Sequence, residues 1–440
     1  MAILNREEAY AVLKKVLKLS KADSCTVSLG GSKQGNIRYA RNTVSTSGME
    51  SNISLAITSA YGRRSGVATT NELDDASLER AVRRSEEVAK LSPENPEFMP
   101  PLGPQEYQES KEFFEETAAI TPEWRAEQTK KCIEYITTKT NDLVAAGFIE
   151  DGQSFSSMAT SAGLFAYRKA TGLDFSLTVR TKDGTGSGWV SRDFNNAKNF
   201  DIMEASEIAL SKAADSANAK AIEPGKYTVI LEPSAANSLL QNMFYNMSAR
   251  SADEGRSFLA KEGGGTKLGE KIVDERVTIY SDPMHKAVPG STWSGSGLPN
   301  TRRVWIENGV VKNLFYNRYW AQKQGVAPVP FPSNGIMEGG KSSLQDLINS
   351  TERGILVTRL WYIRTVDPQT LLYTGLTRDG TFYIENGRIK YPIKNMRFNE
   401  SPVIMLNNLE AIGQPERVSG NLIPPLKIRD FTFTSLSDAI

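Results

Sequence analysis

Short runs of alternating apolar and polar residues, separated by glycines, constrain the fold of this chain most strongly. Four such runs occur, at residues 25–29, 37–44, 53–61 and 66–70. A period of two places every second side chain on the same face of a strand, and closely spaced short strands favour antiparallel pairing. An apolar helical stripe at residues 11–19 precedes them, and a helix capped by Asp74 or Asp75 follows as far as Leu91. The pattern predicts a mostly antiparallel sheet accompanied by helices.

A connector at residues 92–104 interrupts this half of the chain, because it is too rich in proline for either regular structure. A second boundary falls at residues 222–226, before an apolar strand. We therefore expect an α+β protein whose N-terminal α/β half, residues 1–220, consists of two small units divided near residues 92–104. A larger β-rich, mostly antiparallel domain is expected at residues 221–440.

Further elements are predicted from local signals. Thr121-Pro122-Glu123 begins a helix that runs to about Thr140, since a capping hydroxyl, an early proline and an acid are typical of helix starts. A hairpin is expected across Glu150-Asp151-Gly152. The pattern aromatic-Ile-Glu-Asn-Gly occurs twice, at residues 305–309 and 383–387, and Asn-Gly between apolar strands predicts tight hairpin turns.

Composition narrows the possible functions. The chain has one histidine, His285, and two cysteines, Cys25 and Cys132, which cannot supply a two-histidine zinc site or a four-cysteine ribbon. The near-neutral balance of 52 basic and 51 acidic residues argues against nucleic acid as a partner. Neither a membrane-spanning run nor a secretion signal is present, and two thiols in so long a chain fit a reducing compartment. We expect a cytoplasmic protein without a membrane association.

One literal motif match points to nucleotide binding. Gly335-Ile-Met-Glu-Gly-Gly340-Lys341-Ser342 satisfies the phosphate-loop pattern, and Ser342 with Gln345 resembles a capping box. The loop requires a buried strand before it, whereas residues 327–334 contain three prolines. We therefore regard nucleotide binding through Lys341 as a weak alternative. The adjacent acids Glu86-Glu87 and Glu115-Glu116 are interpreted as solvated helix faces, and no G-x-S-x-G elbow occurs.

The segment after the strand at residues 227–231 predicts a core-packing helix capped by Ser234. Its apolar stripe comprises Ala236, Leu239, Leu240, Met243, Phe244 and Met247. Gln241, Asn242 and Asn246 fall off this stripe, and on their own they indicate no more than the polar flank of the helix.

The chain resembles the TldD/TldE (PmbA) family, historically labelled modulators of DNA gyrase and regarded as metallopeptidases that work as a TldD–TldE pair. The resemblance rests on the order and spacing of many segments along nearly the whole chain. These segments are Gly66-Val-Ala-Thr-Thr-Asn-Glu-Leu73, Gly188-Trp-Val-Ser-Arg-Asp-Phe194, Gly255-Arg-Ser-Phe-Leu259, Pro299-Asn-Thr-Arg-Arg303, Ile306-Glu-Asn-Gly309, Glu352-Arg-Gly-Ile-Leu-Val357 and residues 382–392.

The resemblance implies a zinc site in the TldD half of such a pair, built from a helical His-Glu-x-x-x-His motif and a later cysteine. Placed on this sequence, His, Glu and His become Gln241, Asn242 and Asn246, and the tail offers only Ser419 in place of the cysteine. Neutral amides are poor zinc ligands, and an asparagine cannot serve as a general base. The chain therefore matches the TldE-like half, with no catalytic residue and no cofactor of its own.

The leading hypothesis from sequence is a non-zinc-binding subunit of a peptidase that acts on peptides or unfolded chains. A TldD-like partner would supply zinc, both chains would enclose the substrate as an added β-strand, and the chain alone would form a homodimer. A second hypothesis is a non-enzymatic protein that binds peptides or a gyrase-related partner. A third is a stand-alone hydrolase that uses other carboxylates, or the nucleotide-binding protein considered above.

Overall fold

The N-terminal half of the chain builds a single six-stranded sheet. The computed structural model describes residues 3–140 and 142–437 and has a mixed α and β secondary structure. The strand order is β3-β2-β1-β4-β5-β6, with every neighbouring pair antiparallel. The strands are β1 (Ser24–Ala40), β2 (Thr43–Tyr61), β3 (Arg64–Thr70), β4 (Leu143–Thr160), β5 (Phe165–Thr181) and β6 (Ser187–Phe194). The predicted α+β class and antiparallel preference are confirmed.

The strands are longer than the sequence predicted. The run at residues 25–29 and the start of the run at 37–44 belong to one strand, β1, and the turn to β2 falls inside the second run. Arg41 and Asn42 make this turn with φ of 52° and 61°, the left-handed values that a tight hairpin turn requires. At about 3.3 Å per residue, strands of 17 and 19 residues span more than about 50 Å.

The hairpin predicted across residues 150–152 is wrong, because β4 continues through them. Gly152 is paired with Gln34 of β1 and Gly172 of β5. A Cβ at Gly152 would lie 2.8 Å from the carbonyl oxygen of Lys33, so the glycine permits close approach of β1 and makes no turn.

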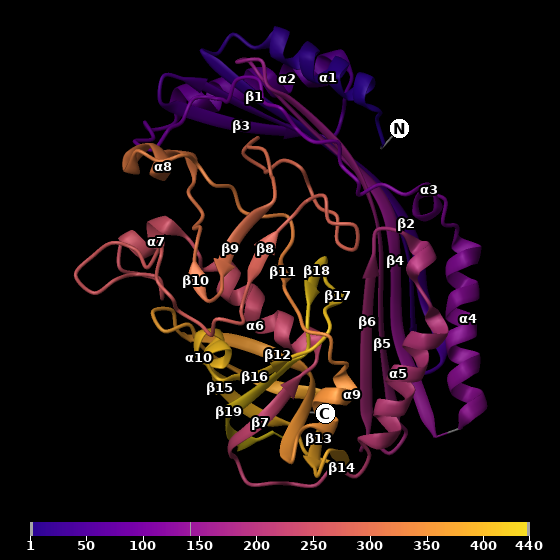
Figure 1. Ribbon diagram of the computed structural model, residues 1–440. Coiled ribbons are helices and arrows are strands. Elements are labelled where there is room, and N and C mark those ends of the chain that lie inside the picture. The colour runs from indigo at the N-terminus through magenta and orange to yellow at the C-terminus, as the bar shows by residue number, and fades with distance from the viewer. Residues whose placement is uncertain (1–2, 141, 438–440) are drawn as a thin grey trace.

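Helices cover the two ends of this long sheet. They are α1 (Arg6–Leu19), α2 (Asp75–Leu91), α3 (Glu115–Ala118), α4 (Pro122–Lys139) and α5 (Ile202–Asp215). Figure 1 shows α1 and α2 at one end and α4 and α5 at the other, and each pair encloses a separate apolar core. The first core includes Phe155 of β4, which follows the connector in sequence. The two small units expected on either side of residues 92–104 therefore share one sheet.

The C-terminal half contains two further sheets around the largest core. In the larger sheet, β13 pairs with both β12 and β15, so that β12, β7, β19, β15 and β13 close on themselves. Its strands are β7 (Gly225–Leu231), β12 (Arg353–Asp367), β13 (Leu372–Glu385), β14 (Arg388–Pro392), β15 (Met396–Glu400), β16 (Leu409–Ile412) and β19 (Leu426–Leu436). Only β7–β12 is parallel among its pairings in the described structure.

The smaller sheet has the order β10-β9-β8-β11-β18-β17, with β11 and β18 parallel. Its strands are β8 (Ile279–Ser281), β9 (Arg303–Glu307), β10 (Val310–Val311), β11 (Ile336–Met337), β17 (Glu416–Val418) and β18 (Asn421–Ile423). The helices of this half are α6 (Pro233–Tyr245), α7 (Ala249–Asp253), α8 (Arg318–Gln324), α9 (Leu344–Asn349) and α10 (Pro402–Asn407).

Both predicted Asn-Gly turns are confirmed. Asn308 and Gly309 join β9 to β10 with φ of 50° and 77°. Asn386 and Gly387 join β13 to β14 with φ of 52° and 73°. Asparagine and glycine are the residues that adopt this left-handed conformation most readily, so the turn chemistry alone was sufficient for the prediction.

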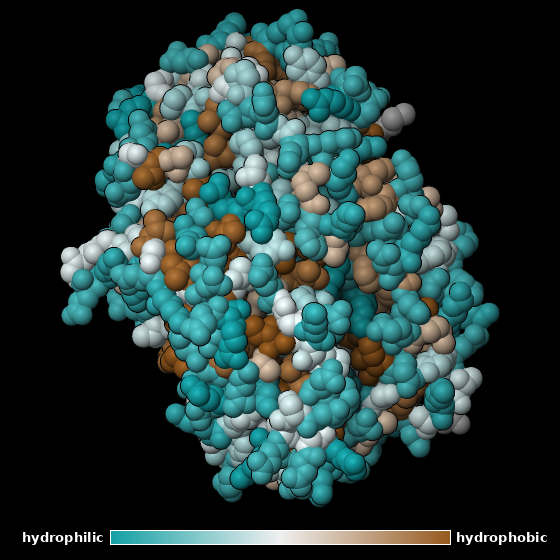
Figure 2. Space-filling view, viewed as in Figure 1, coloured by the Kyte–Doolittle hydropathy of each residue, from teal (hydrophilic) through white to brown (hydrophobic). Residues whose placement is uncertain are grey.

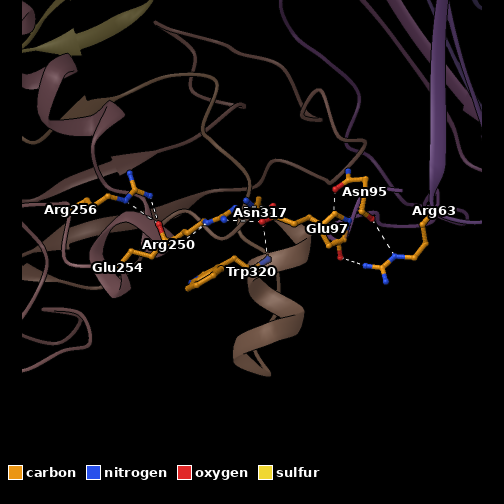
Figure 3. A network of polar contacts seen from close by, with 9 residues as sticks. Arg63, Asn95, Glu97, Arg250, Glu254, Arg256, Asn317 and Trp320 are labelled. Atoms are coloured by element: carbon orange, nitrogen blue, oxygen red, sulfur yellow. Dashed lines mark hydrogen bonds and ion pairs between the residues drawn. The ribbon is translucent and has the colours of Figure 1, made fainter. Parts of the chain in front are cut away.

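The connector also ties the first sheet to the C-terminal domain. Figure 3 shows Arg250 of α7 reaching Glu97 of the connector through two hydrogen bonds of 2.8 Å, while its Nε donates to Glu254 at 3.0 Å. On the other side, the Nε of Arg63 donates to the carbonyl oxygen of Asn95 at 3.3 Å. The segment is thus bonded to both halves, despite its lack of regular structure.

The molecular surface in Figure 2 is largely hydrophilic at its outline, and hydrophobic residues show mainly in the middle of the view. Across residues 3–140 and 142–437, none of the helices combines the length and apolar character needed to cross a membrane.

Candidate functional site

Helix α6 and its C-cap residue, Asn246, carry the three site positions expected from sequence. The predicted apolar stripe is buried at all six positions, namely Ala236, Leu239, Leu240, Met243, Phe244 and Met247. The helix begins at Pro233 with Glu232 as N-cap, so the cap predicted at Ser234 is wrong. Proline suits the first helical position because it has no N–H group to be satisfied there. The buried stripe sets the rotation of the helix and so decides which polar side chains leave the core.

The three polar positions face different surroundings. The Nδ2 of Asn242 donates to the Ser238 carbonyl oxygen at 2.7 Å, and that of Asn246 donates to the Asn242 carbonyl oxygen at 2.8 Å. Asn246 also contacts the Tyr373 hydroxyl at 3.2 Å. Both carboxamides therefore bond to their own helix. Gln241 is half-buried and lines a pocket, and within the described residues its carboxamide has no hydrogen bond.

The pocket beside Gln241 has a volume of about 180 Å³, and Ser419 of the β17–β18 loop also lines it. Gln241 and Ser419 are 178 positions apart in sequence (419 − 241), yet the fold brings them to one cavity. Phe244, Tyr245 and Phe331 supply aromatic walls, and the last two rings stack at 5.2 Å with an interplanar angle of 7°. The pocket thus combines neutral polar groups with aromatic faces.

Two asparagines that sequence reasoning missed complete the polar wall. Asn421 accepts a hydrogen bond from the Gly335 N–H at 2.7 Å and donates to the Oδ1 of Asn237 at 3.3 Å. Asn334 accepts from the Asp282 N–H at 2.9 Å. These residues belong to separate segments, so no local spacing could have identified them. The dipeptide Ser419-Gly420 before Asn421, which is typical of a turn, was the only feature of the sequence that pointed to this part of the pocket.

The N-terminal sheet positions the loop that carries Ser419. Ser419 and Gly420 have φ of 48° and 73°, which closes a tight turn between β17 and β18. Asp193 of β6 accepts from the Gly420 N–H at 2.8 Å and forms an ion pair of 2.9 Å with Arg417. Both side chains of this pair are largely shielded from solvent. The pocket is therefore set by contacts between the two halves.

A row of acids lies on the first sheet beside this loop. Glu150, Asp174 and Asp193 stand directly opposite one another on β4, β5 and β6. Although Asp174 remains exposed, surrounding protein displaces water, and this desolvation raises its pKa to about 6, helped by the charges of Asp193 and Glu150. The positive charge of Arg417 lowers the pKa of Asp174 in part. Asp174 thus lies opposite Asp193, the residue that holds the loop of Ser419.

The donor groups around α6 do not fit a zinc ion. Carboxamides and a hydroxyl occupy positions 241, 242, 246 and 419, whereas zinc prefers thiolate, imidazole and carboxylate ligands. Within residues 3–140 and 142–437, no group of three or more His, Cys, Asp or Glu side chains is placed to hold a metal. His285 lies in the loop after β8, and Cys25 and Cys132 are buried in the two N-terminal cores.

The phosphate-loop match does not fold as that motif requires. Its strand, β11, lies inside the match instead of before it, and the Gly340 N–H donates to the Gly413 carbonyl oxygen at 2.9 Å. The capping box of α9 is formed by Ser343 and Asp346, so the box predicted from Ser342 and Gln345 is wrong. The interpretation of Glu86 as solvated is also wrong, because it is buried and paired with Arg83.

The fold and the site define a two-part α+β protein. A curved antiparallel sheet is hydrogen-bonded to a β-rich domain, and a pocket lined by α6 lies beside the contact between them. Residues 224–435 match the model of the PmbA/TldA metallopeptidase C-terminal domain, and residues 25–89 match that of PmbA/TldA metallopeptidase domain 1. The chain belongs to the TldD/TldE (PmbA) family.

The chain is similar to individual proteins and to solved structures. The chain is 27% identical to an uncharacterized protein of Methanocaldococcus jannaschii over 73% of its own length and 77% of the relative's. It is 24% identical to a metalloprotease of Methanothermobacter thermautotrophicus, over 61% and 62% of the two lengths. Its fold resembles the crystal structure of TldE from Thermococcus kodakarensis, with a TM-score of 0.87, 20% identity and coverage of 97% and 99%.

Proposed function

We propose that this chain is the TldE-like, non-zinc-binding subunit of a two-chain metallopeptidase that acts on peptides or unfolded proteins. The observation that carries the proposal is the shared pocket of Gln241 and Ser419. Gln241 is one of the three positions on which the family resemblance places the zinc motif, and Ser419 lies in the tail where the ligand cysteine is missing. Both residues carry neutral groups.

The chemistry of the pocket supports binding more than hydrolysis. A peptide hydrolase needs a group that takes a proton from the attacking water, and a carboxamide cannot accept that proton near neutral pH. Gln241 offers both a hydrogen-bond donor and an acceptor, and the Ser419 hydroxyl offers the same. Such groups recognise the N–H and C=O groups of a peptide, while the rings of Tyr245 and Phe331 contact an apolar side chain.

In this proposal the catalytic zinc belongs to a TldD-like partner, and this chain completes the chamber and positions the substrate. The substrate is an extended chain, because a folded protein cannot enter a site enclosed by two subunits. Without the partner, the chain pairs with a second copy of itself through the same surface.

The test is affinity purification of the tagged chain from its native cells, followed by identification of the proteins that remain bound. We expect recovery of a family member that carries His-Glu-x-x-x-His, together with peptide cleavage that a zinc chelator abolishes. Recovery of the chain without such a member, in material that binds peptides but leaves them intact, would instead indicate a stand-alone binding protein.

A further inference from the structure

A second cavity, of about 1100 Å³, shares no lining residue with the pocket beside Gln241. One wall is the start of β5, at residues 165–169. The segment that follows the connector supplies another wall at residues 105–114, and the loop after β8 contributes from residues 284–289. The volume lies at the upper end of the range for ligand sites, so the groove accommodates a segment larger than a small metabolite.

The wall formed by β5 is a free sheet edge. Residues 143–159 of β4 pair with residues 165–181 of β5, the whole of that strand, whereas β6 pairs with β5 only over residues 173–180. In the described structure, residues 165–172 of β5 therefore have a strand on one side only. An unpaired strand edge presents a row of N–H and C=O groups that another extended chain can satisfy.

The direction of these backbone groups follows from one hydrogen bond. The Thr171 N–H points away from β4 and donates to the Glu112 carbonyl oxygen at 3.0 Å. Backbone direction in an antiparallel strand alternates with a period of two, so the N–H and C=O groups of Phe165, Tyr167 and Lys169 point to the same side. They face the groove, where residues 105–114 make no backbone hydrogen bond with them in the described structure.

The groove is also strongly basic. Its charged lining residues are Arg6, Lys111, Arg168, Lys169, Lys286 and a single acid, Glu109. Lys111 pairs with Glu109 at 3.4 Å, and Arg168 pairs with the buried Glu112 at 3.0 Å. Three cations remain without an ion pair among the described residues.

Two of these three cations are held in place by aromatic rings. The guanidinium of Arg6 lies 4.9 Å from the Phe165 ring centroid, and the Nζ of Lys169 lies 4.3 Å from that of Phe113. Lys286 is exposed on the loop across the groove. Positive charge from three separate segments thus converges on the edge of one strand, where it attracts an anionic partner.

We propose that this groove binds an extended acidic peptide segment, which adds as a strand to the free edge of β5. The backbone of the segment bonds to Phe165, Tyr167 and Lys169, and its carboxylates pair with the cations of the groove. Nucleic acid lacks the alternating N–H and C=O groups that this edge requires, so the observations favour a peptide. The inference needs neither zinc nor a partner subunit, and its outcome is independent of the function proposed above.

The test is a fluorescence-anisotropy titration of the full chain with a labelled octapeptide of alternating Glu and Val. We expect this peptide to bind at least about tenfold more tightly than the matched Lys-Val octapeptide and than an oligothymidylate of equal length. Methylation of alternate peptide nitrogens removes the donors for the strand edge, and it should weaken binding by a similar factor. The proposal would be overturned if the oligothymidylate bound more tightly than the Glu-Val peptide, or if methylation left the affinity for that peptide unchanged.

Charge reversals locate the site. Lys169→Glu and, separately, Lys286→Glu should each weaken binding of the Glu-Val peptide about tenfold. Lys139→Glu is the matched control, because Lys139 is exposed, lies 5.2 Å from the Tyr135 ring and belongs to the far helix α4. Lys286 lies on an exposed loop, so its reversal tests the site even if Lys169→Glu disturbs folding. Equal affinities in wild type, both reversals and the control would contradict the assignment.

Discussion

Gly188 in β6 occupies a place where a side chain has no room. A Cβ there would overlap the carbonyl oxygen of Ala209 and the amide nitrogen of Ala213, both in the backbone of α5. Gly66 in β3 has the same relation to α2, where the obstacles are backbone atoms of Ser85 and Ala89. Each glycine lets a helix lie directly on the sheet, and each begins one of the segments by which the family was recognised.

Replacement of Gly188 by alanine should therefore destabilise the protein. The added methyl group meets helix backbone, which cannot move aside like a flexible side chain, so we expect a loss of about 1–3 kcal/mol in the free energy of unfolding. Urea denaturation measures the loss. Gly172→Ala in β5 is the matched control, because no atom lies within 4 Å of its added Cβ. Similar losses in both variants would contradict the packing argument.

The glycines also show what local sequence could not predict. Gly152 resembles a turn signal, and the hairpin across residues 150–152 was predicted on that basis. Whether a glycine makes a turn or admits a close neighbour depends on the strand or helix that packs against it, which lies far away in sequence. The prediction therefore divided β4 into two strands, while the left-handed turns at Asn308 and Asn386, which depend on adjacent residues alone, were found.

Glu400 is a buried carboxylate at the end of β15. Burial is the largest influence on it and raises its pKa to about 7, although the backbone N–H groups of Ser401 and Thr432 donate to it at 3.0 and 3.2 Å. The folded state thus holds the proton more tightly than the unfolded chain, whose Glu titrates near 4.5. The resulting stability is present at low pH and is lost as the pH rises from about 4.5 to about 7.

Glu400→Gln removes this titration. Between pH 5 and pH 8 we expect the free energy of unfolding of the wild type to fall by about 2–3 kcal/mol relative to that of the variant. Urea denaturation of both proteins at the two pH values gives the difference. The same comparison with Glu115→Gln, at an exposed position in α3, should give no such change. If the free energies of unfolding of wild type and Glu400→Gln differ by the same amount at both pH values, the assigned effect of burial on the pKa of Glu400 is refuted.

At the scale of elements, two helix starts, those of α2 and α4, were predicted correctly. Asp74 accepts from the N–H groups of Ala76 and Ser77, and Thr121 accepts from that of Trp124, as the capping signals indicated. A cap depends on residues within one turn, so the sequence contains the whole interaction. Where two candidates stand side by side, as Ser342 and Ser343 do before α9, local rules cannot decide between them.

Ser343→Ala should lower the free energy of unfolding by about 1 kcal/mol, because the Ser343 hydroxyl and the Asp346 carboxylate complete the capping box of α9. Ser342→Ala is the neighbouring control, and we expect it to change stability by less than about 0.5 kcal/mol. Thermal denaturation of the two variants measures both changes in stability. A larger loss of stability from Ser342→Ala would assign the N-cap of α9 to Ser342.

The site helix illustrates the same limit. The apolar stripe of α6 was predictable because its period is local, and the family resemblance supplied the positions of Gln241, Asn242 and Asn246. The structure separates Gln241, which lines the pocket, from Asn242 and Asn246, which bond to their own helix. Asn334 and Asn421 could not be predicted, since only the tertiary fold brings their segments together.

At the scale of the whole molecule, the fold class was predictable, but the arrangement of the N-terminal half was not. The connector at residues 92–104 is irregular as expected, yet the strands before and after it share a sheet. Long-range pairing of β1 with β4 leaves no trace in local composition. This pairing allows the first sheet to reach over the C-terminal domain, where Asp193 holds the loop of Ser419.

The central claim, a subunit without its own zinc, is tested most directly by metal analysis of purified protein. The chain would be purified alone and after co-expression with a family member from the same genome that carries His-Glu-x-x-x-His. Zinc per chain would then be measured by mass spectrometry. The account predicts no stoichiometric zinc in the isolated chain and about one zinc ion per pair in the complex. One equivalent of zinc bound to the isolated chain would contradict it.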